Sequence, residues 1–209
     1  MGFKIEYHKL QIKGAVFMPK EYLDLDEKDR MIISLLKDRP DISQSEIAGK
    51  VGISQPSVGV RLRKLKSKGA VSFLIGMNFK KVGLYLAKVD LTAKNTAKIL
   101  DSFKGCPYFL NGLIVSGKNN LCLFLVGEDI STLEAIVDRH LRSNPCATDV
   151  EMNVIITSSD SLVFPVRMTF NNNQNPPCGS EGKCDNCPYY ESERCLGCPI
   201  TGHYRGTFW

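Results

Sequence analysis

The sequence predicts an α+β chain with a winged helix-turn-helix, a ferredoxin-like βαββαβ sandwich and a small cysteine-rich metal-binding module. Capping and breaking residues mark three short helices in the first part. Strand-like and helix-like segments alternate in the second part, and five of the eight cysteines crowd into the last part. The boundaries that we expect are 1–23 for an N-terminal extension, 24–82 for the winged helix-turn-helix, 83–168 for the sandwich, and 169–209 for a linker and the cysteine-rich tail.

The bulk composition is that of an ordinary globular protein, with 43% hydrophobic and 23% charged residues. No apolar run is long enough to span a bilayer. The N-terminal segment alternates apolar and polar residues and is broken by charges, unlike a secretory signal. We therefore expect a cytoplasmic protein without a membrane partner.

The first two helices are predicted from the signals at their ends. A helical apolar stripe begins after Leu25, with acidic residues in its first turn, and Pro40 ends it. Ser43 and Glu46 have the spacing of a capping box, which predicts the start of the second helix. Gly52 then permits a tight turn.

The third helix is predicted to begin at Ser54, a favoured capping residue, and to end at Gly69. The segment AVSFLIGMNFKKVGL follows, at residues 70–84. It predicts a strand, a glycine turn and a second short strand, which would form the wing. The residues that we expect on the core face of the third helix are Val58, Leu62 and Leu65.

Positive charge is concentrated around this third helix. From Ile47 to Val89 the sequence has no acidic residue but nine lysines or arginines. A solvated face usually mixes charges of both signs, whereas a one-signed block is typical of a surface that binds a polyanion. We therefore predict that double-stranded DNA is the partner and that the third helix lies in the major groove.

The second part predicts a split βαβ arrangement. A hairpin-like turn, Gly117-Lys-Asn-Asn120, separates its two middle strands. The segment has no glycine-rich phosphate loop and no convincing nucleophile–base pair, so we do not expect an enzyme. The expected strands are 84–91, 109–117, 120–128 and a last one within 148–164, and the expected helices are 95–105 and 130–144.

The first part resembles the DNA-binding domain of the Lrp/AsnC family of bacterial and archaeal transcription regulators. The matching residues include the opening Leu25-Asp-x-x-Asp-Arg30, the second-helix pattern Ile-Ser-x-x-Glu-Ile-Ala, and Val58-x-x-Arg61-x-x-x-Leu65. The βαββαβ segment is similar to the effector and oligomerisation domain of that family. Together the two parts cover about residues 24–160.

This resemblance implies a homodimer or a larger homo-oligomer that binds DNA. The family usually has a Gly-x-x-Asp turn near its small-molecule effector, but here the turn ends in Asn120, so a small-molecule effector stays open. The third-helix residues implied to lie near base edges or phosphates are Ser54, Gln55, Ser57, Arg61 and Arg63, with Lys64, Lys66 and Lys68 neutralising phosphates.

The tail has the spacing Cys178-x5-Cys184-x2-Cys187-x7-Cys195-x2-Cys198. Two thiolates separated by two residues can chelate one ion or one edge of a cluster. In a chain without a secretory signal, such crowding favours a metal site over disulfides. All five cysteines are therefore candidate ligands, whereas single cysteines earlier in the chain (Cys106, Cys122 and Cys146) are expected to be buried and inert.

Two metal groups fit this spacing. Proline directly after a ligand cysteine is common in ferredoxins, and Pro188 and Pro199 are so placed. The spacing up to Cys195 is also similar to the cluster loop of iron–sulfur DNA glycosylases. A [4Fe-4S] cluster held by four of the five cysteines is the favoured hypothesis. The alternative is a tetrahedral zinc site, which would use Cys184, Cys187, Cys195 and Cys198.

The sequence thus predicts a sequence-specific DNA-binding transcriptional regulator whose tail senses redox state, oxygen or iron through a cluster. With zinc, the tail would have a structural or zinc-sensing role. Three other functions stay open. They are a metal-dependent enzyme acting on nucleic acid, a tetrapyrrole decarboxylase with the same two-domain layout, and an architectural DNA binder without an effector.

Overall fold

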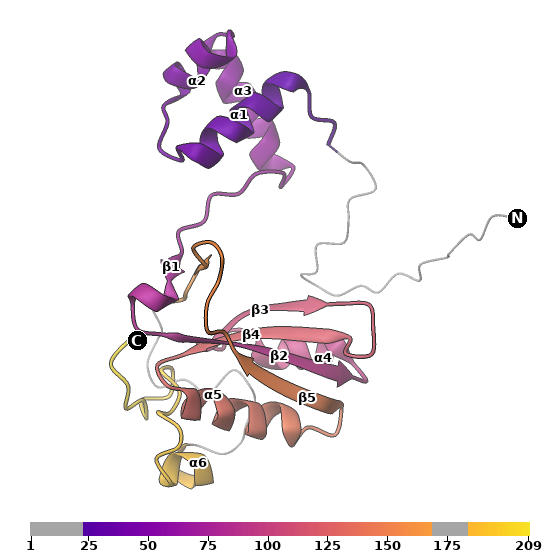
Figure 1. The fold of residues 1–209 in the computed structure, drawn as a ribbon, viewed down its shortest axis with the longest axis vertical. Helices are drawn as coiled ribbons and strands as arrows, with labels where there is room; N and C mark the ends of the chain where they lie inside the picture. Colours follow the sequence, from indigo (N-terminus) through magenta and orange to yellow (C-terminus); the bar gives the residue numbers. More distant parts are fainter. Residues whose placement is uncertain (1–22, 169–183) are drawn as a thin grey trace, which may run out of the picture. The chain divides into compact units, whose positions relative to one another are not determined.

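The computed structural model describes residues 23–168 and 184–209 (Figure 1). The chain divides into two compact units, Met1–Leu74 and Ile75–Trp209. We call the first the helical unit; within the second, we call residues 75–168 the α/β unit and residues 184–209 the tail. The division falls at Leu74, earlier than the expected end of the DNA-binding domain at residue 82. Nearly all of the expected N-terminal extension, most of the linker and Cys178 lie outside the described residues.

Three helices form the helical unit: α1 (Glu27–Asp38), α2 (Gln44–Val51) and α3 (Gln55–Ser67). The capping box predicted at the start of α2 is present. The Ser43 hydroxyl accepts a hydrogen bond from the Glu46 N–H, and the Glu46 carboxylate accepts one from the Ser43 N–H, each at 3.2 Å. Such caps satisfy backbone donors that the helix itself leaves unpaired, so they fix where a helix begins.

The other residues predicted to mark helix ends also do so. Gly52 adopts a left-handed conformation with φ 68° directly after α2. Ser54 caps α3 by accepting a hydrogen bond from the Ser57 N–H. The three helices enclose one apolar core, formed by Ile32, Leu36, Ile42, Ile47, Ala48, Val51, Val58 and Leu62.

The predicted wing hairpin does not form. Residues 71–76 contain no strand. The next strand, β1 (Met77–Asn78), pairs antiparallel with β6 (Val163–Phe164), which is a partner within the α/β unit. Gly76 permits this pairing, because a Cβ atom there would lie 2.6 Å from the Val163 side chain. The second strand expected in the wing therefore belongs to the α/β unit, where its hydrogen-bond partner lies.

The α/β unit has the predicted ferredoxin-like topology. Its antiparallel sheet has the strand order β3-β4-β2-β5 (Figure 1). The elements are β2 (Tyr85–Ala93), α4 (Thr96–Phe103), β3 (Phe109–Ile114), β4 (Leu121–Gly127), α5 (Ile130–Val137) and β5 (Ala147–Val154).

Alternate side chains of β2 and β4 point into a main core with α4 and α5, as the two-residue strand period requires. Leu91, Leu121, Leu125 and Leu133 are completely buried there. The helix expected at 130–144 is α5 followed by a π-helical turn, η2 (Asp138–Arg142). The opposite sheet face carries a second cluster, which includes Phe79 of the 3-10 turn η1 (Phe79–Lys81).

The cysteine-rich tail packs against the α/β unit. It contains a 3-10 turn, η3 (Cys184–Asn186), and one short helix, α6 (Pro188–Glu191). Trp209 at the chain end contacts both apolar clusters and stacks edge-on against Tyr108, with ring centroids 5.0 Å apart. In the part of the chain that the structure describes, no helix has the length and apolar character needed to cross a membrane.

Candidate nucleic-acid interface and cysteine-rich site

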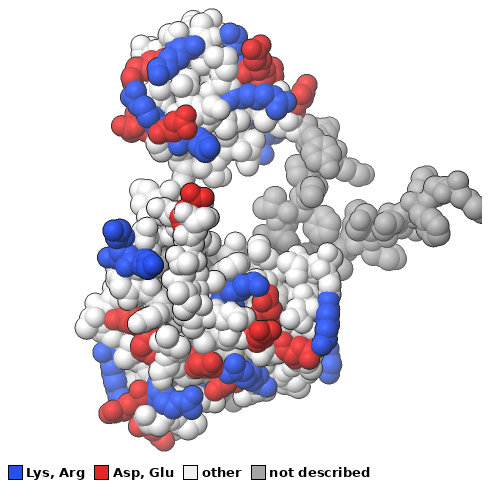
Figure 2. Space-filling model, viewed as in Figure 1, with Lys and Arg blue, Asp and Glu red and all other residues white. Residues whose placement is uncertain are grey.

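Helix α3 presents the predicted DNA-contacting residues along its outer face. Its inner face is formed by Val58, Leu62 and Leu65, which are buried as expected. The side of the helical unit in view in Figure 2 carries acidic as well as basic residues. The predicted residues that are exposed to solvent are Ser54, Gln55, Ser57, Arg63, Lys64, Lys66 and Lys68.

A shallow hollow of about 560 Å³ lies between α2 and α3. Arg63 and Lys66, one turn apart on α3, both line it, and Gln44 closes it from the start of α2. Two cations on one rim form a local site of positive potential of the kind that neutralises adjacent phosphates. The hollow therefore combines a concave surface with two basic side chains of α3.

Arg61 has a different environment from the other basic residues of α3. Its Nη1 donates to Asp26 Oδ2 at 2.6 Å and to Asp29 Oδ1 at 2.7 Å, and Asp29 is buried. The hydrogen bond to Asp29, followed by that to Asp26, raises the pKa of Arg61 further above its usual range. Arg61 therefore ties α3 to the start of α1, and its contact with DNA stays a prediction.

Replacing Arg61 by Gln is expected to lower the thermal unfolding midpoint of the helical unit by several degrees, because the buried Asp29 carboxylate loses its cation. Thermal melts followed by circular dichroism measure this. Arg63→Gln is the control, because Arg63 lies two residues away on the exposed face and its removal leaves no buried charge. Equal midpoints for the two variants would contradict the structural role of Arg61.

The capping carboxylates predict an acid-sensitive helical unit. A backbone hydrogen bond from Asp29 lowers the pKa of Asp26, and one from Ser43 lowers the pKa of Glu46. Their contribution is fully present above the unfolded-state pKa of about 4 and is lost as the pH falls through the lower folded-state pKa. Urea midpoints measured across this range should fall less steeply in Glu46→Gln than in the unchanged protein. Parallel curves would contradict the prediction.

The described cysteines of the tail approach one another and the α/β unit. Cys187 is buried, and Arg139 Nη1 lies 2.8 Å from its sulfur. Burial raises the pKa of the Cys195 thiol, while a hydrogen bond from the Gly197 backbone acts in the opposite direction. The nearby thiols of Cys187 and Cys184 raise that pKa further, which places the three groups in one neighbourhood.

The chemistry of this donor set fits a metal that prefers sulfur. Four thiols lie in the described tail, and both a guanidinium and a backbone amide are directed at sulfur atoms. Within residues 23–168 and 184–209, no group of three or more potential ligands is gathered closely enough to form a finished site. Among the single cysteines, Cys122 is buried as predicted, while Cys106 and Cys146 are half-buried.

Side chains of the α/β unit that the sequence did not single out hold the tail in place. Glu128 accepts hydrogen bonds from the Tyr204 hydroxyl and from the N–H and hydroxyl of Thr207. Thr132 accepts one from the Leu196 N–H at 3.0 Å. No motif or periodicity links these residues to the tail, because they are 64 or more positions apart in the sequence.

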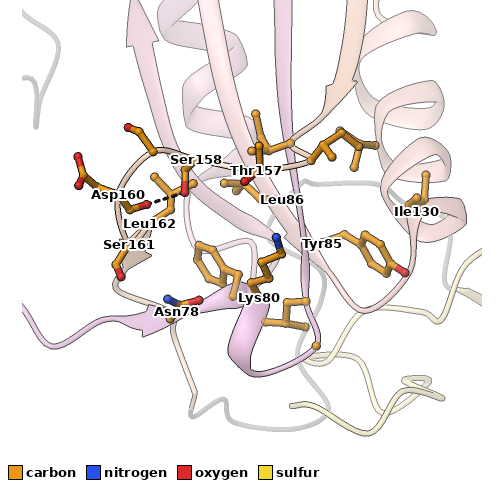
Figure 3. Close-up of a pocket in the computed structure, with 17 residues that line it drawn as sticks. Asn78, Lys80, Tyr85, Leu86, Ile130, Thr157, Ser158, Asp160, Ser161 and Leu162 are labelled. Carbon is orange, nitrogen blue, oxygen red and sulfur yellow. Dashed lines mark hydrogen bonds between the residues drawn. The ribbon is translucent and has the colours of Figure 1, made fainter.

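A second candidate site in the α/β unit is a cavity of about 620 Å³, which lies where β2 begins and β5 ends. Figure 3 shows Lys80 extending into it from η1, with Tyr85 and Leu86 of β2 beside it. The segment after β5 supplies polar atoms, including Ser158, whose hydroxyl donates to the Asp160 carbonyl at 2.6 Å. An apolar floor with a few polar groups is the usual composition of a small-molecule site.

Comparison with known proteins finds similarity to DNA-binding transcriptional regulators. Residues 25–72 match the family model described as winged helix-turn-helix DNA-binding. The transcriptional regulator AzlB of Bacillus subtilis is 23% identical over 146 residues, covering 66% of this chain and 93% of AzlB. The regulator LrpA of Pyrococcus horikoshii is 27% identical over 117 residues, and the match covers 52% of this chain and 82% of LrpA.

Solved structures agree with this. The structure of LrpC from B. subtilis has a TM-score of 0.57 with this chain at 26% sequence identity. The match covers 67% of this chain and 100% of LrpC. The chain is similar in sequence and fold to regulators of the Lrp/AsnC type. The leucine response regulatory protein LrpA of Mycobacterium tuberculosis, at 22% identity, shares the fold with a TM-score of 0.57. About a third of this chain has no counterpart in LrpC.

Proposed function

We propose that this Lrp/AsnC-type protein binds specific duplex DNA through α3 and carries a metal group on its cysteine-rich tail. The observation that carries the metal proposal is the burial of Cys187 against Arg139, because metal-bound sulfurs are typically buried and accept hydrogen bonds from neighbouring donors. A [4Fe-4S] cluster is the favoured group, and zinc is the alternative.

The tail residues around the cysteines support the cluster. Pro188 directly follows Cys187 and begins α6, and proline after a ligand cysteine is a feature of ferredoxins. The candidate ligands are the four described tail cysteines together with Cys178. When bound, a cluster would supply a one-electron redox couple, while the chain's own residues position the sulfurs and limit access of solvent.

Docking of the tail offers a physical route to regulation. The tail's last residue packs into both apolar clusters of the α/β unit, so a change in tail conformation changes the packing of that unit. We propose that loss or oxidation of the metal group alters DNA affinity through this contact, which makes redox state, oxygen or iron supply the signal.

Assembly into a homodimer or larger oligomer is part of the proposal. Several large apolar side chains of the α/β unit are exposed in the single chain, including Ile75 at 96%, Ile156 at 80% and Ile114 at 52%. Exposed apolar surface of this extent favours contact with a second copy. Sedimentation of the purified protein tests this, and a stable monomer would contradict it.

The test of the metal group is the visible absorption spectrum and metal content of protein purified without oxygen. A broad band near ~400 nm with roughly four irons per chain supports the cluster. A colourless protein with one zinc supports the alternative, in which the tail is structural or senses zinc. Protein that binds neither iron nor zinc overturns the metal proposal. DNA binding that ignores both sequence and metal would favour an architectural role, and catalytic turnover of nucleic acid or a tetrapyrrole would favour an enzyme.

A further inference from the structure

Both Cys-x-x-Cys pairs of the tail are held by side chains of the α/β unit. Leu196 and Gly197 are the two residues between Cys195 and Cys198. The Leu196 N–H donates to Thr132 Oγ1 at 3.0 Å, and the Gly197 carbonyl accepts a hydrogen bond from the Tyr108 hydroxyl. The first pair is held through Cys187, whose sulfur lies 2.8 Å from Arg139 Nη1.

The side chains that make these contacts are built into the core of the unit. Thr132 is completely buried and Tyr108 is 3% exposed. Burying a polar group is unfavourable unless it is hydrogen-bonded, and part of the hydrogen bonding of both residues goes to the tail. Their positions therefore fit a domain that is complete only when the tail is docked.

The geometry of the second pair also depends on docking. Gly197 has φ +85°, and a Cβ atom there would lie 2.5 Å from the His203 carbonyl oxygen. Glycine thus lets the loop between the two cysteines pass close to His203, while Thr132 and Tyr108 hold its backbone through hydrogen bonds. These contacts fix the backbone between the two cysteines.

Resting on the metal function proposed above, we propose that the α/β unit supplies the outer shell of the tail's metal site, with Arg139 as its principal positioning residue. Arg139 lies on the π-helical turn η2, a type of turn that is frequent at functional positions. Its guanidinium is always charged, so it donates to the Cys187 sulfur and offsets the negative charge of a thiolate-ligated group. Thr132 and Tyr108 position the second cysteine pair.

The test measures zinc affinity of the reduced, metal-free full-length protein by competition with a chromophoric chelator. Outer-shell substitutions usually weaken metal binding about 10–100-fold, and we expect a loss in this range for Arg139→Gln. Arg142→Gln is the matched control, because Arg142 lies on the same turn but pairs with Glu134 and Asp138 instead of a cysteine. Arg139→Lys keeps the charge and should recover part of the affinity.

Two further measurements separate positioning from general destabilisation. Thr132→Val keeps the side-chain shape but removes the acceptor for Leu196, so it should also weaken zinc binding while α/β secondary structure is retained. If the native group is a cluster, Arg139→Gln should lower its reduction potential, because a nearby cation favours the more negative reduced state.

The outcomes distinguish this inference from the metal proposal itself. Protein that binds neither zinc nor a cluster overturns the metal proposal. Protein that binds metal with equal affinity in the unchanged, Arg139→Gln and Arg142→Gln forms overturns only the role of Arg139. Equal losses for Arg139→Gln and Arg142→Gln also overturn it, because the effect would then follow from the charge of η2 and not from the contact with Cys187.

Discussion

Replacing Arg63 and Lys66 together by Gln is expected to reduce affinity for duplex DNA on the order of 10-fold near physiological salt. These residues line the hollow between α2 and α3. Within the described residues, neither forms an ion pair like those of Arg61 with Asp26 and Asp29. Each lost phosphate contact should also reduce the slope of log affinity against log salt by about 0.9. Fluorescence anisotropy with a labelled duplex across a salt series measures both quantities.

The matched control changes the same net charge elsewhere in the helical unit. Arg30 and Lys37 are exposed on α1, so the double variant Arg30→Gln, Lys37→Gln also removes two cations. Affinity and salt slope should remain close to those of the unchanged protein. An equal loss in both double variants would mean that overall charge, not α3, attracts DNA, and the assignment of α3 as the recognition helix would be wrong. Arg61 is unsuitable for this test, because its removal also disturbs the fold.

Removing the metal group is expected to change operator affinity about 5- to 150-fold, which corresponds to the usual coupling of ~1–3 kcal/mol between two sites. The reason is that the tail contacts the α/β unit, which is proposed to assemble the oligomer. Trp209 of the tail packs on its core, and Glu128 and Arg139 of that unit contact tail residues. Titrations of one labelled operator with holo-protein and with chelator-treated, reduced protein at fixed salt measure the coupling. Restoring the metal should restore the affinity.

Linkage gives this prediction a second readout. If metal changes DNA affinity by some factor, saturating DNA must change metal affinity by the same factor. Cys195→Ser should behave as metal-free protein, whereas Cys146→Ser is the control, because Cys146 is half-buried outside the tail. Equal operator affinities for holo- and metal-free protein would end the proposal that the tail is a sensor, while leaving a structural role open.

Local features of the fold could be predicted from the sequence because their causes are local. Ser43, Glu46 and Gly52 act within one or two turns of their own position, so a capping box and a left-handed turn can be read directly. The strand and helix order of the α/β unit follows from apolar periodicity in the same way. The inner face of α3 was likewise predictable, since Val58, Leu62 and Leu65 recur at helical spacing.

Two features of the structure could not be predicted from the sequence, and both depend on partners that are distant in the chain. The wing hairpin was expected from a strand, a glycine and a second strand close together, but β1 pairs with β6, a strand 86 residues further on at Val163. Arg61 looked like its basic neighbours on α3, yet the carboxylates that it contacts lie 32 and 35 residues earlier. Neither partner could be identified from spacing along the chain.

By itself the sequence determined the helical start and stop points, the basic outer face of α3 and the clustering of cysteines, because each depends on neighbours within a few residues. Only the tertiary structure decided which basic residue supports the fold, where the strand after α3 pairs, and which side chains hold the cysteine pairs. Contacts such as Arg139 with Cys187 join positions 48 residues apart. Such contacts form when apolar packing brings distant segments together, and no local pattern encodes them.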